Sequence, residues 1–493
     1  MSAGHPPPAA HDAEGIALLR GALDAAGYEE RRVRDALELG KLLDRRPWQI
    51  PAYLHVLPEE EDLPTLIRLF LLGVPVSADA AARALDGVPL ERLERMDVLV
   101  RDGDRVRARL ELAPVERALI ASDPSQAEGH LPDHVLGITP GTLVLDALTV
   151  RRPVESALDV GTGSGLLAVH AAAHAERVVA VDVNARALRF AEFNAALNAV
   201  ANVEWREGSL FEPVAGETFG LAVCNPPYYI SPELEVVFRD SGLPSDSFCE
   251  AVVRGLPEHL AEGGLGHVLV SWVHGDEEDW SVPLRRWVDG SGCDALLLRY
   301  RTWAPLTYAA SANRPAGVDA GQYDQALDRW IGYYREQGIE RISWGALVLR
   351  RRSGGDNWIW AHQPSATKID PASGHVERLL AAQDLLRSDD GMLSLLGEPV
   401  ALAREHRIEQ TLRLDGRDGP PRTMLRLEGG LRFQVEVDDP TLSLLSRLDG
   451  RRTLGETLDI LDPGGESALA DAALPVVAHL LELGFVVVDG NGE

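Results

Sequence analysis

"ALDVGTGSGLLAV", residues 157–169, passes from an apolar run to a glycine-rich turn and then to a helical pattern. Gly161, Gly163 and Gly165 follow the apolar run, and glycine there permits a tight turn and close approach of a ligand to the backbone. In open α/β sheets, ligands bind outside the carboxyl ends of the strands. The stretch therefore predicts a buried strand, a ligand-binding loop and the start of a helix.

The next apolar run, "VVAVDVN" at residues 178–184, supplies an acidic partner for this loop. Asp182 stands at its end, where a carboxylate can accept hydrogen bonds from both ribose hydroxyls. A dinucleotide fingerprint has the spacing G-x-G-x-x-G, which opens a helix N-terminus to a pyrophosphate. Here the spacing is G-x-G-x-G behind Asp159, so the loop departs from that fingerprint.

The loop and Asp182 together resemble the first motifs of class I S-adenosylmethionine-dependent methyltransferases. The resemblance implies S-adenosyl-L-methionine as cofactor, with its methionine end across the loop and its adenine near "EGSLFEP", residues 207–213. Many members of this class have an aspartate where this chain has Ser209, which can still accept a bond from the adenine amine. The cofactor-binding residues implied by the resemblance are Asp159, Gly161, Thr162, Gly163, Gly165, Asp182, Val183, Asn184, Ser209, Leu210 and Asn225.

The second distinctive stretch is "VCNPPYYISP", residues 223–232, which ends another apolar run. Asn225 precedes a proline and is therefore held extended, and the two prolines stiffen the turn. The Asn225 side-chain oxygen and the Pro226 carbonyl can accept both hydrogens of an NH2 group. Such acceptors orient a planar nitrogen and favour the positive charge that develops on it during alkylation, while Tyr228 can lie flat against the planar group.

Asn-Pro-Pro-Tyr after such a loop resembles the signature of methyltransferases that act on planar nitrogens. The chain is similar to the group with a small methyltransferase domain, which includes release-factor glutamine methyltransferases and ribosomal or transfer RNA base methyltransferases. The resemblance implies Asn225, Pro226, Pro227 and Tyr228 as catalytic residues.

The expected fold class is α/β: a doubly wound, Rossmann-like, seven-stranded methyltransferase sheet with a winged-helix-like α+β domain on each side. The pattern divides the chain into a disordered lead (1–12), a helical, winged-helix-like domain (13–125), a methyltransferase domain (126–355) and a C-terminal winged-helix-like domain (370–493). The seven expected strands, read as a parallel sheet, are "ESALDV" (155–160), "RVVAVDV" (177–183), "VEWREG" (203–208), "GLAVCN" (220–225), "LGHVLVSWV" (265–273), "DALLLRY" (294–300) and "ISWGALVLRR" (342–351).

Each flanking segment contains a predicted hairpin. In the N-terminal segment, "LVRDGDRVRARLELAPV" (99–115) alternates around Asp102-Gly103-Asp104 after helical stretches. In the C-terminal segment, "MLRLEGGLRFQVEVDDP" (424–440) reads as a hairpin, followed by helices and a final strand. The N-terminal module could bind nucleic acid or a partner, or serve only to cover the catalytic domain; no basic recognition helix is visible in it. The C-terminal outline resembles small winged-helix modules that often hold peptides or other protein segments, and it could equally be a structural cap.

Three further residues are candidates for substrate contacts: Thr139, Tyr229 and Arg239. Thr139 stands before Pro140 and a helical pattern, so it is a candidate helix cap as well as a cofactor or substrate contact. Arg239 follows the Asn-Pro-Pro-Tyr stretch in a segment expected to form a lid or substrate loop. The histidines show no metal-ligand spacing, and we expect no metal site.

Composition narrows the classes of partner. The formal net charge of -28 over 493 residues opposes non-specific attraction to phosphate backbones. No run of eighteen apolar residues and no secretion signal is visible, so we expect neither a membrane span nor export. Cys224, Cys249 and Cys293 are far apart, which fits a reducing cytoplasm.

The sequence therefore predicts a cytoplasmic S-adenosylmethionine-dependent N-methyltransferase of a macromolecule. The preferred substrate is a glutamine or asparagine amide of a protein. An RNA or DNA base methyltransferase, acting on an adenine or guanine amine, is the first alternative. A protein that binds S-adenosylmethionine without catalysis is the second, and the intact Asn225 corner argues against it. The sequence does not predict the oligomeric state.

Overall fold

The computed structural model describes residues 5–125, 132–233, 244–313, 320–354, 356–365, 370–411, 422–463 and 468–488. Its contacts form two compact units. The first unit comprises residues 1–146 and 151–362, and the second comprises residues 147–150 and 363–493. The large sheet and the candidate site belong to the first unit.

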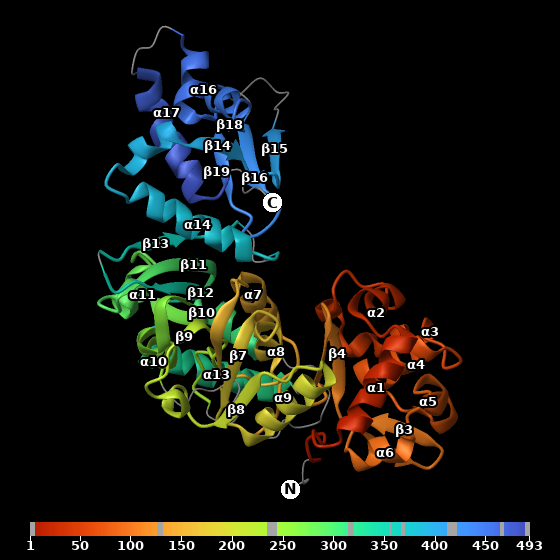
Figure 1. Ribbon diagram of the computed structural model, residues 1–493. Helices are drawn as coiled ribbons and strands as arrows, with labels where there is room; N and C mark the ends of the chain where they lie inside the picture. Colours follow the sequence, from red (N-terminus) through yellow and green to blue (C-terminus); the bar gives the residue numbers. More distant parts are fainter. Residues whose placement is uncertain are drawn as a thin grey trace. The chain divides into compact units, whose positions relative to one another are not determined.

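An eight-stranded mixed sheet forms the centre of the first unit (Figure 1), in the order β13-β11-β12-β10-β9-β6-β7-β8. Its strands are β6 (Val154–Val160), β7 (Ala175–Asp182), β8 (Val203–Glu207), β9 (Phe219–Cys224), β10 (Leu260–His274), β11 (Cys293–Trp303), β12 (Arg341–Arg351) and β13 (Ile359–His362). All seven expected strands are present, and the sheet has the predicted Rossmann-like α/β arrangement.

Two features of the sheet correct the prediction. The sheet has an eighth strand, β13, and β12 runs antiparallel to both of its neighbours, β10 and β11. A strand that is buried on both faces has a continuous apolar sequence, which carries no information about the direction of its neighbours. The parallel part is limited to β10-β9-β6-β7-β8 and the β11–β13 pair.

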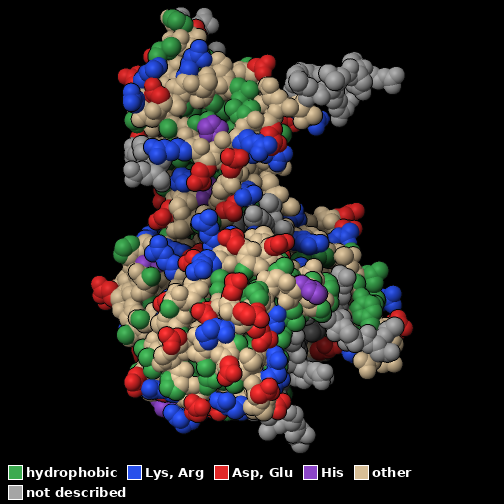
Figure 2. All heavy atoms as spheres, turned by 90° about the vertical axis from the view of Figure 1, so that its right-hand side faces the viewer, with side chains coloured by type: hydrophobic (Ala, Val, Ile, Leu, Met, Phe, Trp, Pro, Cys, Tyr) green, Lys and Arg blue, Asp and Glu red, His purple; other side chains and the backbone are tan. Residues whose placement is uncertain are grey.

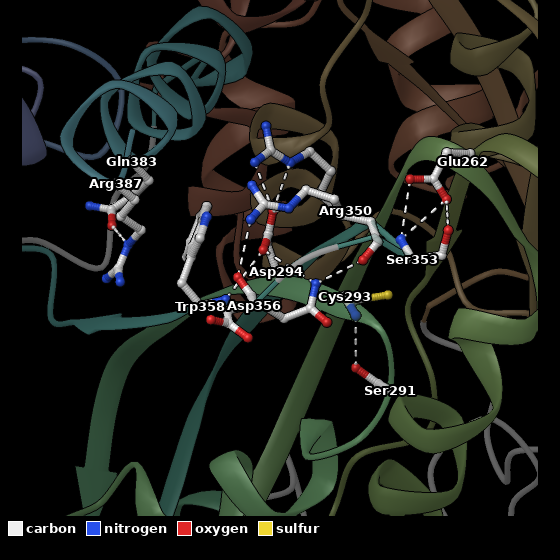
Figure 3. Close-up of polar contacts among 12 residues, drawn as sticks. Glu262, Ser291, Cys293, Asp294, Arg350, Ser353, Asp356, Trp358, Gln383 and Arg387 are labelled. Atoms are coloured by element: carbon white, nitrogen blue, oxygen red, sulfur yellow. Dashed lines mark hydrogen bonds and ion pairs between the residues drawn. The ribbon is translucent and has the colours of Figure 1, made fainter. Parts of the chain in front are cut away.

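A buried charge anchors the eighth strand, as Figure 3 shows. Asp294 on β11 is fully buried and accepts hydrogen bonds from Arg350 Nε (3.1 Å) and Nη2 (2.7 Å) on β12. It also accepts from the backbone N–H of Trp358 (3.2 Å), immediately before β13. Strand β13 pairs with β11 from Ile359 to His362, and the first unit extends to residue 362.

Helices flank the sheet in pairs. They are α7 (Pro140–Leu148), α8 (Leu166–Ala171), α9 (Ala185–Leu197), α10 (Ser247–Gly255), α11 (Val282–Val288), α12 (Pro305–Ala312) and α13 (Ala320–Glu336). Helices α8 and α9 contact each other and the strands β6 to β8, whereas α10 and α11 contact each other and β10. The short 3-10 turns η4 (Glu212–Val214) and η5 (Leu256–His259) complete this part of the chain.

The N-terminal region is helical and contains two hairpins. Its elements are α1 (Ala13–Ala26), α2 (Glu30–Ala36), η1 (Leu42–Asp44), η2 (Pro47–Gln49), α3 (Ile50–His55), α4 (Asp62–Leu66), η3 (Ile67–Leu71), β1 (Val76–Ser77), α5 (Ala78–Ala84), α6 (Leu90–Arg95), β2 (Leu99–Asp102), β3 (Arg105–Ala108), β4 (Glu111–Val115) and β5 (Ala118–Ser122). The predicted hairpin turns at Gly103 and pairs β2 with β3.

This region does not pack as a separate body. Its apolar core continues into α9, where Phe190 and Phe193 are fully buried against it. Part of the expected disordered lead also makes contacts: the N–H of Ala9 donates to Met96 O (2.9 Å), and Arg186 Nη1 donates to His5 O (2.7 Å). These partners are remote in sequence, so composition alone gave no sign of them. Residues 1–4 lie outside the described residues.

Asn194 of α9 and Asn198, which caps the end of this helix, bond to the backbone of β5 as a neighbouring strand would. Asn194 accepts from the N–H of Ala121 (2.8 Å) and donates to Ala121 O (2.8 Å), and Asn198 bonds both backbone groups of Leu119 in the same way. Because residues four apart lie on one helix face, the two amides meet alternate residues of β5. Asn194 also donates to Ser164 O (2.8 Å) in the glycine-rich loop, so one buried side chain connects the N-terminal region to that loop.

The second unit contains two three-stranded sheets, β18-β14-β19 and β15-β16-β17. Its elements are α14 (Ser373–Leu386), η6 (Gly391–Gly397), β14 (Pro399–Leu402), β15 (His406–Thr411), β16 (Arg422–Leu427), β17 (Gln434–Val437), α15 (Asp439–Leu445), β18 (Asp449–Thr453), α16 (Leu454–Leu461), α17 (Ala468–Glu482) and β19 (Val486–Val488). The predicted hairpin is present as β16 and β17, and the helices and the last strand follow it as expected. Throughout the described part of the chain, every helix is too short or too polar to cross a membrane.

Replacing Asn194 tests the side-chain ladder. We expect Asn194→Ala to lower the free energy of unfolding by roughly 2–4 kcal/mol, because it leaves three buried backbone groups without partners. Urea unfolding followed by circular dichroism measures the change. Glu192→Ala, on the exposed face of the same helix, is the control and should change the free energy by less than about 0.5 kcal/mol. Equal stabilities of the two variants would contradict this account.

Candidate functional site

A cavity of about 1000 Å³ opens where β6, β7 and β9 end. Strand register explains its position: Val160 of β6 pairs with Val181 of β7 on one side and with Cys224 of β9 on the other. The three chains therefore leave the sheet at one level. The predicted residues that line the cavity are Thr139, Gly161, Thr162, Gly163, Asp182, Val183, Asn184, Ser209, Leu210, Asn225, Pro226, Pro227, Tyr228 and Tyr229.

Three predicted site residues are not among those lining the cavity. They are Asp159 on β6, Gly165 directly before α8, and Arg239, which falls outside the described residues. Gly165 has φ = 85°, and a Cβ there would lie 2.8 Å from Ala191 Cβ. A glycine at this position thus lets the start of α8 approach α9 closely.

The other two loop glycines face open space. Gly161 and Gly163 have φ values of 71° and 55°, in the left-handed region that favours glycine, and a Cβ at either would have no neighbour within 4 Å. The loop thus presents bare backbone to the cavity. A ligand can approach it as closely as the sequence pattern predicts.

Asp159 supports this loop from beneath. Its carboxylate is 1% exposed and accepts a hydrogen bond from Thr162 Oγ1 (2.7 Å). Burial raises the pKa of Asp159 to about 7; the Thr162 bond opposes this shift and the charge of Asp182 adds to it.

Asp182 is the acidic group at the cavity itself. One carboxylate oxygen accepts from the N–H of Gly163 (2.8 Å) and the other from the N–H of Asn184 (2.8 Å). Burial raises the pKa of Asp182, and these backbone bonds oppose the shift. A carboxylate can accept about four hydrogen bonds, so lone pairs remain for hydroxyl donors. The neighbouring Val183 is 58% exposed and offers an apolar surface along the cavity.

At the Asn-Pro-Pro-Tyr corner, the two ends of the Asn225 amide have different surroundings. Nδ2 donates to Thr142 Oγ1 of α7 (3.2 Å). Oδ1 is buried and has no hydrogen-bond partner within the described part of the chain. A buried acceptor without a partner is costly, and such atoms call for a ligand or a water. Asn225 thus lines the cavity and has a buried acceptor that no described protein group uses.

Aromatic side chains form the wall beside the corner. Tyr228 and Tyr229 stack at 5.9 Å between ring centroids, and Tyr229 meets Tyr308 of α12 at 6.3 Å. Trp303 and Trp344 also line the cavity. Burial raises the pKa of Tyr228, so its hydroxyl stays neutral.

Helices α12 and α13 hold the chain that follows the corner, a role that the sequence analysis missed. The N–H of Ile230 donates to Tyr308 Oη (3.3 Å), and Tyr334 Oη donates to Ile230 O (2.8 Å). The Trp330 indole and the Ile230 side chain are buried in the same apolar cluster. The aromatic run "DRWIGYYRE" at residues 328–336 was the available signal, because so many aromatic residues on one helix require a partner surface.

The segment before α7 forms another wall, as expected. Thr139 accepts from the N–H of Thr142 (3.1 Å), so it caps α7 while also lining the cavity. Asp123 secures the preceding residues: it accepts from the N–H of Val135 (2.8 Å) and from Arg186 Nε (3.0 Å) on α9. Asp123 and Arg186 were not predicted, because no local pattern connects them.

One group of the described residues has an arrangement that could hold a metal ion: Glu116, Asp146 and His170, whose ligand atoms lie within 4.8 Å of one another. Arg151 forms ion pairs with both carboxylates: its Nη2 lies 2.9 Å from Asp146 and its Nη1 lies 3.4 Å from Glu116. The carboxylates are thus already paired with a cation, and the group is an ion-pair network.

Comparison with protein families decides the class of the central region. Residues 138–264 match the model of the methyltransferase small domain, which covers the loop, Asp182 and the Asn225 corner. These residues are a methyltransferase small domain. The match confirms the domain predicted from the two motifs. The flanks match two domains of unknown function, DUF7059 over residues 25–109 and DUF7782 over residues 377–488.

Curated relatives match part of this chain. A protein of Methanocaldococcus jannaschii, provisionally named a protein N5-glutamine methyltransferase, is 33% identical over 131 residues, 25% of this chain and 66% of its own. The release factor glutamine methyltransferase of Geobacter sulfurreducens is 35% identical over 25% of this chain and 47% of its own. The ribosomal protein uL3 glutamine methyltransferase of Xanthomonas campestris is 35% identical over 23% and 41%. This chain thus spans two thirds or less of each relative.

The buried carboxyl of Asp159 predicts a pH dependence. Its pKa in the folded protein, about 7, exceeds the ordinary 3.8, so between these values the folded state keeps a proton that the unfolded chain releases. Its contribution to stability therefore falls as pH rises from about 4 to 7. Relative to wild type, Asp159→Asn should gain on the order of 3 kcal/mol of unfolding free energy between about pH 4 and pH 8. Urea unfolding at both pH values measures the gain.

A control separates this effect from the general loss of one negative charge. Asp328 on α13 is exposed, so Asp328→Asn removes a carboxylate that water already solvates. A pH-independent difference between Asp159→Asn and wild type would show that Asp159 ionises normally.

Proposed function

We propose that this protein transfers a methyl group from S-adenosyl-L-methionine to the side-chain amide of a glutamine or asparagine in a protein. The observation that carries the proposal is the buried, unpartnered Oδ1 of Asn225 at the cavity wall, next to Pro226 of the same corner. An amide NH2 has two hydrogens to donate, and this oxygen and the Pro226 carbonyl are the two acceptors that it needs.

The other half of the cavity suits the cofactor. We assign the Asp182 carboxylate to the ribose hydroxyls, the bare backbone at Gly161 and Gly163 to the methionine end, and Val183 and Leu210 to the faces of the adenine. Ser209, which lines the same end, is the candidate acceptor for the adenine amine. The relatives' names and the matched methyltransferase small domain support this cofactor.

The chemistry follows from orientation. An amide nitrogen is a poor nucleophile because its lone pair is delocalised into the carbonyl. Two acceptors on its hydrogens fix the lone pair toward the sulfonium methyl and stabilise the positive charge that forms as the N–C bond forms and the S–C bond breaks. The alkylated nitrogen then loses a proton readily, so no strong base is required before the attack.

The lining of the cavity favours a neutral substrate over a nucleotide. No lysine or arginine occurs among the described residues that line it, and the wall beside Asn225 consists of aromatic rings. A nucleic acid would bring phosphates close to this wall without a cation to receive them. On the face in Figure 2, basic side chains lie among acidic ones, in keeping with the net charge of -28.

We infer a winged-helix-like arrangement for residues 62–108. Support comes from the order α4, β1, α5, α6, β2, β3 and from the sheet order β1-β3-β2. Two arginines near the hairpin are paired with carboxylates: Arg92 Nη2 of α6 bonds Glu14 (2.9 Å), and Arg101 Nε of β2 bonds Glu94 (2.9 Å). We propose a packing role for this region, because its apolar core continues into α9. The expected winged-helix-like character of residues 370–493 stays a prediction. We propose the cytoplasm as the place of action, because the relatives named above act on translation proteins.

Two substitutions separate catalysis from cofactor binding. Asn225→Ala should lower the transfer rate by at least about a hundredfold and leave the dissociation constant of S-adenosylmethionine within about threefold, because the acceptor acts on the substrate nitrogen. Asp182→Ala should weaken cofactor binding by at least about tenfold, because it removes the ribose acceptors. Calorimetry with the cofactor and transfer of tritiated methyl groups measure the two quantities. Surviving turnover in Asn225→Ala would contradict the proposed chemistry.

The substrate class has its own test. Lysate from cells of the source organism that lack this protein is incubated with purified protein and tritiated S-adenosylmethionine, and the labelled material is divided by protease and nuclease. Label released by protease and recovered as N5-methylglutamine or methylasparagine supports the proposal. Label released only by nuclease would establish the base methyltransferase instead.

A further inference from the structure

The first turn of α7 touches both functional side chains of the corner. Thr142 accepts the Asn225 Nδ2 hydrogen at 3.2 Å, and Gly141 lies against Tyr228. Helix α7 lies before β6 in the sequence, whereas the corner follows β9, so no local pattern connects them.

We propose that Thr142 is a positioning residue that sets the orientation of the Asn225 amide, so that Oδ1 and not Nδ2 faces the substrate nitrogen. The inference rests on the proposed amide methyltransferase function and deepens it. Asparagine has an acceptor and a donor of nearly equal shape, and rotation by half a turn exchanges them. The rotated amide would present an NH2 group to the substrate's NH2 group, and two donors do not bond.

The hydroxyl of Thr142 is suited to this task because it is itself held. Thr142 Oγ1 and Thr139 Oγ1 lie 2.9 Å apart and share a hydrogen bond, and Thr139 also accepts the N–H of Thr142. The oxygen therefore has a fixed place at the start of the helix. In the proposed arrangement the Thr142 hydroxyl donates its hydrogen to Thr139 Oγ1, so its oxygen offers only lone pairs to Asn225 and selects the amide end that can donate, Nδ2.

Helix α7, which contains Thr142, is held in place one turn later by the ion pairs of Asp146. Asp146 is buried and bonds His170 Nδ1 of α8 at 2.9 Å and Arg151 Nη2 at 2.9 Å. Because α8 begins directly after the glycine-rich loop, this contact ties the element that orients Asn225 to the element beside the cofactor loop. The Glu116–Asp146–His170 group described above thus fixes α7 against α8.

Gly141 gives a second, independent contact. A Cβ on Gly141 would come within 2.4 Å of Tyr228 Oη and 3.4 Å of Tyr228 Cζ. The hydroxyl end of Tyr228 therefore lies against the helix backbone, and a side chain at residue 141 would displace it. The first turn of α7 thus locates Asn225 by a hydrogen bond and Tyr228 by steric contact.

The test compares Thr142→Val with Thr142→Ser. Valine keeps the shape of threonine without the hydroxyl, whereas serine keeps the hydroxyl. With lysate lacking this protein as the substrate pool and tritiated S-adenosylmethionine as donor, Thr142→Val should transfer label about tenfold more slowly than wild type, the cost of one oriented hydrogen bond. Thr142→Ser should restore the rate to within about threefold. Calorimetry should show cofactor binding within about threefold of wild type for both variants, because Thr142 does not hold the cofactor.

The possible results separate this inference from the function on which it rests. A wild-type rate in Thr142→Val, or an equal loss in Thr142→Val and Thr142→Ser, would overturn the positioning role and leave the methyltransferase function in place. Absence of transfer by the wild type itself would overturn the proposed function and the positioning role together. A rate restored by serine and not by valine supports the proposal, since a purely structural role would follow shape.

Gly141→Ala gives a second test of the role of α7, which does not depend on the Thr142 hydroxyl. It should slow transfer in the wild-type background, because its Cβ displaces Tyr228. In a Tyr228→Phe background, where Oη is absent, adding Gly141→Ala should cause a smaller further loss. Equal losses in the two backgrounds would show that Gly141 does not act through Tyr228.

Discussion

The register of three adjacent strands is the constraint on which the rest of this structure depends. Val160 of β6 pairs with Val181 of β7 and with Cys224 of β9, so the glycine loop, Asp182 and Asn225 leave the sheet at one level. A slip of β9 by two residues would move Asn225 by about 7 Å, far beyond hydrogen-bond range of anything held by the loop. Both proposed ligands depend on that alignment, because the transferred group must pass directly from one to the other.

The two ends of the cavity at these strand ends have different chemical linings. The end formed by the loop is acidic and lined by bare backbone, which suits a ligand with hydroxyl and ammonium donors. The end at the corner contains aromatic rings and an amide oxygen that lacks a protein partner. Because no charged group stands at the second end within the described residues, recognition there depends on geometry. The positions of the corner residues are in turn set by the helices that contact them, which are α7, α12 and α13.

The N-terminal region adds to the same scaffold. Phe190 and Phe193 of α9 are buried in its core, and Asn194 joins its strand β5 to the glycine-rich loop. A module attached in this way cannot rotate freely against the methyltransferase small domain without breaking buried hydrogen bonds. Arg92 and Arg101 of this region are paired with carboxylates, which agrees with a packing role.

By itself, the sequence determined the features that are local. Periodicity and glycine spacing identified seven strands, the loop, Asp182 and the Asn225 corner, because each is encoded within a dozen residues. Only the tertiary structure decided that β12 runs antiparallel, that Asp294 recruits β13, that Asp159 and Gly165 are not among the residues that line the cavity, and that Thr142, Tyr308 and Tyr334 hold the corner. Each of these depends on contacts between residues remote in sequence. Such contacts follow from packing and burial, which no short pattern of residues records.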